Sequence, residues 1–276
     1  MSERLVAGLA VREWGDPADP GILLWPGLGS TGAYFAQVAP ALPGRTVAVD
    51  PPGFGRSPPL DGYTFERLTD LAAAVAHDCG CWAVVGHSLG AYLAVGVAAD
   101  PPPDLRAAVL IDGGFMDATA MAEAGMPVSS GREQLIAWMR ANAPLFADWE
   151  TAVRELAMMI GGEPTAAFEA YVREVFVEAG GEIRERTPPG EMADQVLAIV
   201  DRDVLTPVKR VQVPTLLIAS GQPAERRPAR ERAWRQFADS SSLIESQVVD
   251  AWGHNPALQD SDACARLIAD WLERQR

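Results

Sequence analysis

Residues 82–99 read WAVVGHSLGAYLAVGVAA, an apolar run that leads through a glycine-flanked serine into a run of small residues. The apolar part, residues 82–86, predicts a buried strand, and residues 89–99 predict a helix. Residues 86–90 fit the pattern G-x-S-x-G, in which the glycines allow a tight strand-to-helix turn. That turn lifts the serine hydroxyl out of the sheet and sets the next N–H at a helix N-terminus, where negative charge is favoured. The local pattern therefore predicts that Ser88 is a nucleophile.

Short apolar runs alternate with helical patterns on both sides of this stretch, as they do in parallel βαβ units. The runs are aliphatic and β-branched with little polar alternation, which indicates strands that are covered on both faces. The predicted strands are residues 21–25, 46–50, 82–86, 106–112, 214–220 and 246–250. We therefore expect an α/β fold with a mostly parallel central sheet flanked by helices.

The strand pattern stops between residues 116 and 205, where only helical periodicity remains. Glycine and proline pairs divide this segment into several helices. We expect an α/β core made of residues 1–115 and 206–276, interrupted by an all-helical insert of residues 116–205.

Composition and charge exclude several classes of protein. The chain has 276 residues, of which 48% are hydrophobic and 22% charged, as is usual for a soluble globular protein. A net charge of −14 argues against nucleic-acid binding and against binding to anionic lipid surfaces. No apolar run reaches the roughly 18 residues needed to span a membrane, and the N-terminus lacks a signal-peptide pattern. We expect a cytoplasmic protein that acts on a small molecule, either as a monomer or as a homodimer.

The cysteines and histidines do not form a metal-binding pattern. Cys79, Cys81 and Cys264 lack the spacing of a zinc site or a redox motif, so we expect reduced thiols. The chain has three histidines and no glycine-rich phosphate loop of the required spacing. We therefore expect no metal ion and no nucleotide or flavin cofactor.

Four motifs, taken in chain order, resemble those of the α/β-hydrolase fold superfamily. They are Pro26–Gly29 after a strand, Asp50–Ser57 with the pattern D-x-x-G-x-G-x-S, Gly86–Gly90, and the Gly-His within Trp252–Asn255 before the last helix. The resemblance covers nearly the whole chain. It implies a serine hydrolase in which residues 116–205 form a helical cap.

A serine hydroxyl needs a base beside it, because alone it is a poor nucleophile at neutral pH. His254 follows a predicted strand and comes last in the chain, which is the order expected for this fold. His87 is adjacent to Ser88 and is expected to point away into packing, and His77 ends a helix, where a cation suits the dipole. We therefore expect His254 to be the base.

The acid of the triad has two candidates. The resembling family usually carries it after the strand that corresponds to residues 214–220, but Ala224 stands at that position here. Some members place the acid at the end of the strand that follows the serine helix, and this favours Asp112. Glu225 is the alternative, although the arginines after it could pair with it on the surface. Asp250 is a poorer third candidate, and we favour Asp112 over Glu225.

The oxyanion of acyl transfer needs two backbone N–H donors. Leu89, the residue after the serine, supplies one, and by resemblance Leu28 supplies the other. Pro26 stands where the family usually has His, so the side-chain hydrogen bonds of that His are lost. Both N–H donors, of Leu28 and Leu89, are kept.

Aromatic and methionine side chains in the insert are candidates for an apolar substrate pocket. The candidate lining residues are Trp138, Met139, Met158 and Tyr171. We expect the substrate to be a fairly apolar carboxylic ester, lactone or thioester. The alternatives are a C–C bond-cleaving, cyclising or otherwise non-hydrolytic enzyme of the same fold, and a catalytically silent ligand-binding protein.

Overall fold

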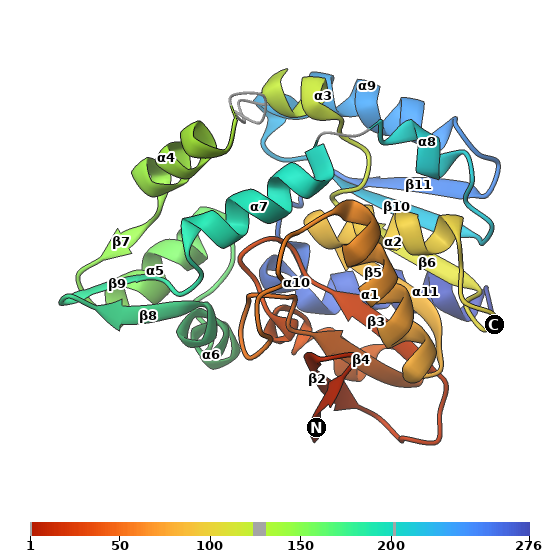
Figure 1. Cartoon of the computed structure of the whole chain (residues 1–276), viewed down its shortest axis with the longest axis horizontal. Coiled ribbons are helices and arrows are strands. Elements are labelled where there is room, and N and C mark those ends of the chain that lie inside the picture. Colours follow the sequence, from red (N-terminus) through yellow and green to blue (C-terminus); the bar gives the residue numbers. More distant parts are fainter. Residues whose placement is uncertain (1, 124–130, 201–202) are drawn as a thin grey trace.

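The computed structural model describes residues 2–123, 131–200 and 203–276 of the chain. Within these residues the strands form one eight-stranded sheet, in the order β1-β2-β4-β3-β5-β6-β10-β11 (Figure 1). The strands from β4 to β11 in this order are parallel, whereas β1 and β2 pair antiparallel with each other and β2 pairs antiparallel with β4. The bounds are β1 Ser2–Val6, β2 Leu9–Trp14, β3 Gly21–Trp25, β4 Arg45–Val49, β5 Cys81–His87, β6 Ala107–Ile111, β10 Thr215–Ser220 and β11 Ile244–Val249. The mostly parallel sheet that the apolar runs predicted is confirmed.

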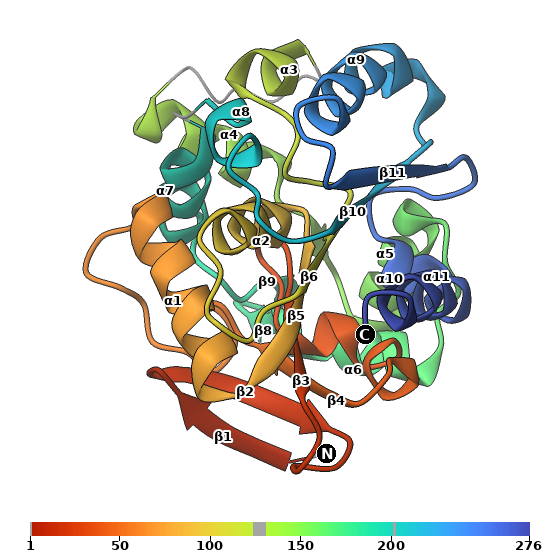
Figure 2. The same cartoon turned by 90° about the vertical axis from the view of Figure 1, so that its right-hand side faces the viewer.

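Helices cover both faces of the sheet. Successive residues of its central strands point to opposite sides, and the side chains on each side are mainly apolar. Leu23 and Leu110 pack into an apolar cluster with α1, α2 and α9, whereas Leu24 and Val109 pack into a second cluster with α10 and α11. Figure 2 shows α1 and α2 on one side of the sheet and α10 and α11 on the other. The bounds of the helices and 3-10 turns of the core are η1 Gly32–Phe35, η2 Ala39–Ala41, α1 Phe65–Asp78, α2 Leu89–Ala99, η3 Ala224–Arg226, α9 Arg227–Ala238, α10 Pro256–Gln259 and α11 Ser261–Glu273.

The N-terminal strands β1 and β2 were not among the predicted strands. The outer strand, β1, is an edge strand in which four of five residues are exposed, so it lacks a continuous apolar run. The two strands turn back at Ala7 and Gly8, which both have positive φ. The inner strand, β2, is largely buried, but Arg12 and Glu13 interrupt its apolar run, so it does not show the continuous apolar pattern of the central strands.

The segment between β6 and β10 lies beside the carboxyl end of the sheet and is called the insert below (Figure 1). Its described elements are α3 Ala118–Glu123, α4 Arg132–Asn142, β7 Leu145–Phe146, α5 Trp149–Ile160, α6 Ala166–Val175, β8 Phe176–Ala179, β9 Glu182–Glu185, α7 Pro189–Val200 and α8 Leu205–Val208. Residues 124–130 and 201–202 of the predicted insert lie outside the described residues.

The prediction of an all-helical insert is wrong in one respect. The strands β7, β9 and β8 form a small antiparallel sheet in that order. These strands have only two to four residues each, which is too short for a period-two pattern to appear beside the helical stripes.

Buried and partly buried polar contacts attach the insert to the core. Glu174 of α6 accepts hydrogen bonds from Arg12 of β2 and from the hydroxyl of Thr31, the latter at 2.6 Å. On α7, Gln195 donates to the carbonyl oxygen of Pro52 at 2.7 Å. These contacts bring α6 and α7 against loops at the carboxyl ends of β3 and β4, where the candidate site lies.

None of the helices in the described part of the chain combines the length and the apolarity that crossing a bilayer requires.

Candidate active site

Ser88 lies in the sharp turn between β5 and α2, with φ of 52° and ψ of −115°. A positive φ is strained for a residue with a side chain, and such strain is found where the fold holds a functional group in place. Glycines make the turn possible. A Cβ on Gly86 would lie 2.1 Å from the carbonyl oxygen of Gly90, and one on Gly90 would lie 2.2 Å from that of Trp25. The G-x-S-x-G spacing is therefore a steric requirement of this chain.

His254 joins Ser88 to Asp112 through two hydrogen bonds. Its Nε2 lies 2.9 Å from the Ser88 Oγ, and its Nδ1 lies 2.6 Å from the Asp112 Oδ2. Asp112 directly follows β6, whereas His254 lies in the loop between β11 and α10. The three side chains thus come from three loops at the carboxyl ends of parallel strands, where functional groups of open α/β sheets gather.

The carboxylate of Asp112 is buried and has charged and polar partners. Its Oδ1 accepts hydrogen bonds from the backbone N–H of Ser220, at 2.9 Å, and from the guanidinium of Arg230. Burial by itself raises the pKa of a carboxyl, but the hydrogen bond and charge of His254, the charge of Arg230 and the N–H of Ser220 outweigh it and lower the pKa of Asp112. Asp112 is therefore held as an anion that can orient the imidazole.

The other acid candidates lie apart from His254. Glu225 is exposed in η3, and Asp250 forms an ion pair with Arg227 at 2.7 Å with a side chain that is 74% exposed. Within the described part of the chain, neither carboxylate forms a hydrogen bond or an ion pair with His254. Of the three acids considered, the structure brings only Asp112 to the imidazole.

Arg230 is a residue that the sequence analysis missed, because it was regarded only as a surface partner for Glu225. Its side chain is 8% exposed, and besides Asp112 it contacts the carbonyl oxygen of Gln222 at 3.0 Å. A signal was present in the sequence. Arg230 precedes Trp234 and Phe237 by one and two helical turns, and both of these side chains are buried. Arg230 therefore belongs to the buried face of α9.

The predicted oxyanion donors lie beside the serine. Leu28, Leu89, Ser88 and His254 line a common cavity of about 170 Å³. Leu89 is the first residue of α2, so its N–H has no acceptor within the helix. The loop of Leu28 passes close to the serine, since a Cβ on Gly27 would lie 3.0 Å from the Ser88 Cβ.

The loop that follows Pro26 is supported without the histidine that the resemblance led us to expect. The N–H of Ser30 donates to the carbonyl oxygen of Gly27 at 3.2 Å, and the Ser30 hydroxyl lies 3.1 Å from the hydroxyl of Tyr171 in the insert. Tyr171 of the insert thus contacts the loop in which Pro26 replaces the expected histidine.

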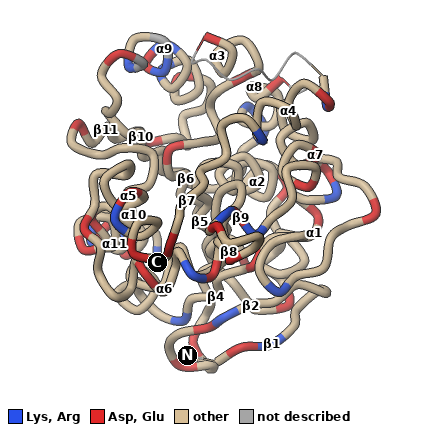
Figure 3. Tube along the Cα trace, turned by 90° about the vertical axis from the view of Figure 1, so that its left-hand side faces the viewer, with Lys and Arg blue, Asp and Glu red and all other residues tan. Residues whose placement is uncertain are grey.

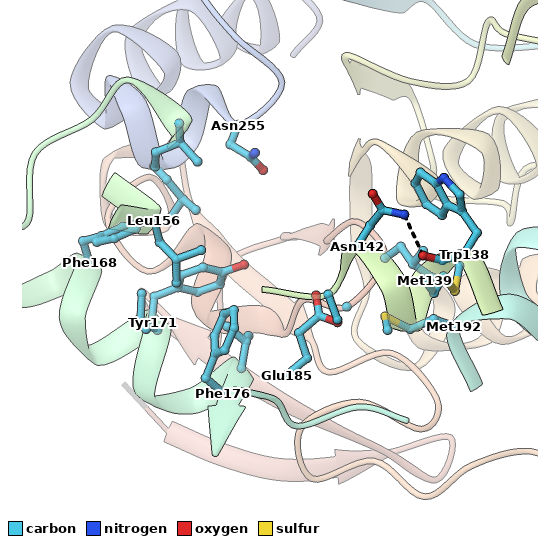
Figure 4. Close-up of a pocket in the computed structure, with 17 residues that line it drawn as sticks. Trp138, Met139, Asn142, Leu156, Phe168, Tyr171, Phe176, Glu185, Met192 and Asn255 are labelled. Carbon is cyan, nitrogen blue, oxygen red and sulfur yellow. Dashed lines mark hydrogen bonds between the residues drawn. The ribbon is translucent and has the colours of Figure 1, made fainter. Parts of the chain in front are cut away.

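A second cavity, of about 350 Å³, lies between the insert and the core (Figure 4). Trp138, Met139 and Tyr171 line it, as the sequence analysis expected. It shares Leu28 with the smaller cavity and also includes Asn255, the neighbour of His254. The two cavities therefore adjoin at the loop next to Ser88.

The expectation that Met158 lines the pocket is wrong. Its side chain is 65% exposed and lies in neither cavity. The reason is helical geometry. At 100° per residue, Met158 lies more than a quarter-turn from the face of α5 that carries Val153, Ala157 and Ile160. Met158 was chosen because it is a methionine in the insert, but it does not lie on the apolar stripe of α5.

His87 is buried beside the site and contacts the backbone of the base. Its Nε2 lies 2.7 Å from the carbonyl oxygen of His254, so this nitrogen carries the proton, and its ring stacks on Tyr34 with 4.4 Å between centroids. Burial, assisted by the nearby His254 imidazole, lowers the pKa of His87 to about 3. As expected from the sequence, its ring points into packing.

We expect this buried histidine to make the protein less stable in acid. In the unfolded chain His87 gains a proton as the pH falls through about 6.5, whereas in the folded chain it stays neutral until about pH 3. The free energy of unfolding should therefore fall with decreasing pH over this interval, by up to about 1.4 kcal/mol per pH unit from His87. Urea unfolding at pH 7, 6 and 5 should show a shallower decline for His87→Gln than for the wild type. Equal slopes in the two proteins would contradict the assignment.

Comparisons with known proteins agree with this architecture. A family model described as "Alpha/beta hydrolase family" matches residues 22–267. The chain is 26% identical over 258 residues to the pimeloyl-[acyl-carrier protein] methyl ester esterase of Chromobacterium violaceum, covering 93% of this chain and 95% of that protein.

Solved structures show the same fold. The crystal structure of E-2-(acetamidomethylene)succinate hydrolase is 22% identical, with a TM-score of 0.78 and 99% of each chain covered. A thioesterase domain from the curacin biosynthetic pathway is 20% identical, with a TM-score of 0.72 and coverage of 97% of this chain and 98% of that one.

Proposed function

The chain belongs to the alpha/beta hydrolase family, and from that membership we propose that it is a serine hydrolase that cleaves a carboxylic ester, lactone or thioester of a fairly apolar small molecule. The observation that carries this proposal is the continuous chain of hydrogen bonds from the Ser88 hydroxyl through His254 to the buried Asp112. The 26%-identical relative named as a methyl ester esterase supports an acyl substrate.

In this mechanism the Ser88 Oγ attacks the substrate carbonyl while the His254 Nε2 takes the hydroxyl proton. The N–H groups of Leu28 and Leu89 donate hydrogen bonds to the oxyanion that forms. His254 then gives the proton to the leaving alcohol or thiol as the carbonyl–oxygen or carbonyl–sulfur bond breaks. The product of this half-reaction is an acyl ester on Ser88.

A water molecule completes the reaction. His254 takes a proton from the water as its oxygen attacks the acyl carbonyl, and it returns that proton to the Ser88 Oγ when the acid leaves. The His254 side chain is 53% exposed, so water reaches it from the solvent side. Asp112 stays ionised and stabilises the imidazolium at both stages.

A fluorophosphonate probe tests the proposal, because it reacts with an activated serine by forming a P–O bond and releasing fluoride. We expect one adduct per chain, found on Ser88 by mass spectrometry and missing from Ser88→Ala. A panel of p-nitrophenyl esters, aromatic lactones and acyl thioesters would then identify the acyl bond that is cleaved. An unlabelled protein, or an adduct on another serine, would overturn the proposal.

A further inference from the structure

Glu185, at the end of β9, lies in the larger cavity. Among the described residues that line this cavity it is the only Asp, Glu, Lys, Arg or His. Figure 4 shows its carboxylate directed into the space between Tyr171 and Phe176 on one side and Met139 and Met192 on the other. A single carboxylate thus faces a cavity whose other walls are mainly apolar and aromatic.

Nothing in the described part of the chain neutralises this carboxylate, which takes part there in no hydrogen bond or ion pair. The adjacent Arg186 is engaged elsewhere, because its guanidinium donates to the carbonyl oxygens of Glu174 and Phe176 at 2.9 and 3.0 Å. Desolvation is the cause that raises the pKa of the Glu185 carboxyl above its ordinary value. A cation placed in the cavity would favour the charged form of Glu185 and so offset this penalty.

The aromatic walls suit the same kind of ligand. Trp138, Tyr171 and Phe176 line the cavity with Glu185. The faces of aromatic rings attract ammonium groups, and quaternary ammonium ligands are often held by several rings. An anionic ligand would meet a carboxylate here and no basic side chain among the described lining residues. The lining side chains therefore favour a cationic ligand over an anionic one.

We propose that the larger cavity binds a positively charged ammonium group of the substrate, with Glu185 as its counter-ion and the aromatic side chains as its walls. This inference rests on the proposed function, since it specifies the substrate of the same site. The cavity reaches Leu28, the proposed oxyanion donor, and Asn255, the neighbour of His254. A substrate whose carbonyl lies at Ser88 can therefore extend past Leu28 and place its cationic end near Glu185.

The charge of the whole chain acts in the same direction. There are 37 acidic residues against 23 basic ones. Figure 3 shows acidic residues spread over several elements of the face that carries β7, β8 and β9. A negative potential concentrates cations near the surface and repels anions, so approach to the cavity favours a cationic substrate.

Two esters of matched shape test the proposal. p-Nitrophenyl ε-aminocaproate carries a terminal ammonium group, and p-nitrophenyl heptanoate ends in a methyl group in its place. We expect Glu185→Gln to lower the ratio of kcat/KM for the cationic ester to that for the neutral ester by about tenfold or more, because a partly buried charge pair is weakly screened. The kcat/KM for heptanoate should change by less than about threefold, because an apolar chain gains little from a carboxylate.

Glu182→Gln is the matched control. Glu182 lies on the same strand but is exposed, so its replacement removes the same charge outside the cavity. The ratio for this variant should stay within about twofold of the wild-type ratio, because an exposed charge is screened by salt. An unchanged ratio in Glu185→Gln, or an equal fall in both variants, would overturn the proposal.

A binding measurement separates this inference from the proposed function. Calorimetry with hexyltrimethylammonium and the wild-type protein needs no turnover, and we expect binding that weakens about tenfold or more in Glu185→Gln but not in Glu182→Gln. If the fluorophosphonate probe leaves Ser88 unlabelled but this pattern holds, the hydrolase proposal fails and the ammonium site stands. If both esters are cleaved without any effect of Glu185, or if the ammonium ion binds equally to all three proteins, the ammonium site fails.

Discussion

Replacement of Ser88 by alanine should lower kcat by about 10⁴-fold or more, because it removes the atom that forms the acyl-enzyme bond. Alanine suits this position sterically, since it is smaller than serine and meets the same positive φ of 52° with a similar strain. The folded structure should survive, with a shift in Tm of no more than about 2 °C. Steady-state kinetics on the best ester of the panel, together with thermal unfolding, would measure both quantities.

The double variant with His254→Ala is the control for this expectation. Residues that act as one unit give non-additive losses, so Ser88→Ala combined with His254→Ala should cost about as much as Ser88→Ala alone. Additive losses would show that Ser88 and His254 act independently. Turnover of Ser88→Ala close to that of the wild type would contradict the role of Ser88 directly.

Asp112→Asn should lower kcat by roughly 10²–10⁴-fold. The contacts of Asp112 explain why the amide takes the harmful orientation. Oδ1 is fixed by two donors, Ser220 and Arg230, so the amide oxygen takes this place and the NH₂ group faces the Nδ1 of His254. That nitrogen must then accept, the ring proton moves to Nε2, and Nε2 can no longer take the proton of Ser88.

The same substitution should also lower stability, by about 1–3 kcal/mol, because Arg230 stays buried opposite a neutral partner. Rates should therefore be measured well below the Tm of the variant, after circular dichroism has shown that it is folded. Glu225→Gln is the matched control, and its exposed side chain should cost less than about tenfold in kcat. A larger loss in Glu225→Gln than in Asp112→Asn would transfer the role of the acid to Glu225.

Features that depend on a few consecutive residues could be predicted from the sequence. The turn at Ser88 is one of these, because the G-x-S-x-G pattern is local and a Cβ on Gly86 would clash with Gly90 of the same five residues. The parallel strands are another, since a strand covered on both faces must be apolar along its whole length. The family resemblance rested on such local motifs, and the match of the family model to residues 22–267 confirms it.

Features that depend on contacts between distant parts of the chain came only from the folded molecule. Asp112 and Glu225 were both reasonable acids, and what separates them is which one the sheet order β6-β10-β11 brings to His254. Arg230 of α9 contacts the same carboxylate, and this contact also exists only in the folded chain. The roles of these residues remain predictions that the Asp112 variant tests.

The insert shows most clearly the difference between features set by local sequence and features set by tertiary contacts. Its helical stripes were visible in the sequence because a repeat every three to four residues reports which side of a helix is buried. The small sheet β7-β9-β8, the exposure of Met158 and the placing of Glu185 in a cavity were not visible, because each depends on which other element packs against that residue. Neighbouring residues determine the local backbone geometry and the hydrophobic periodicity. The partner of a charged group and the wall of a pocket are determined only when distant segments pack together.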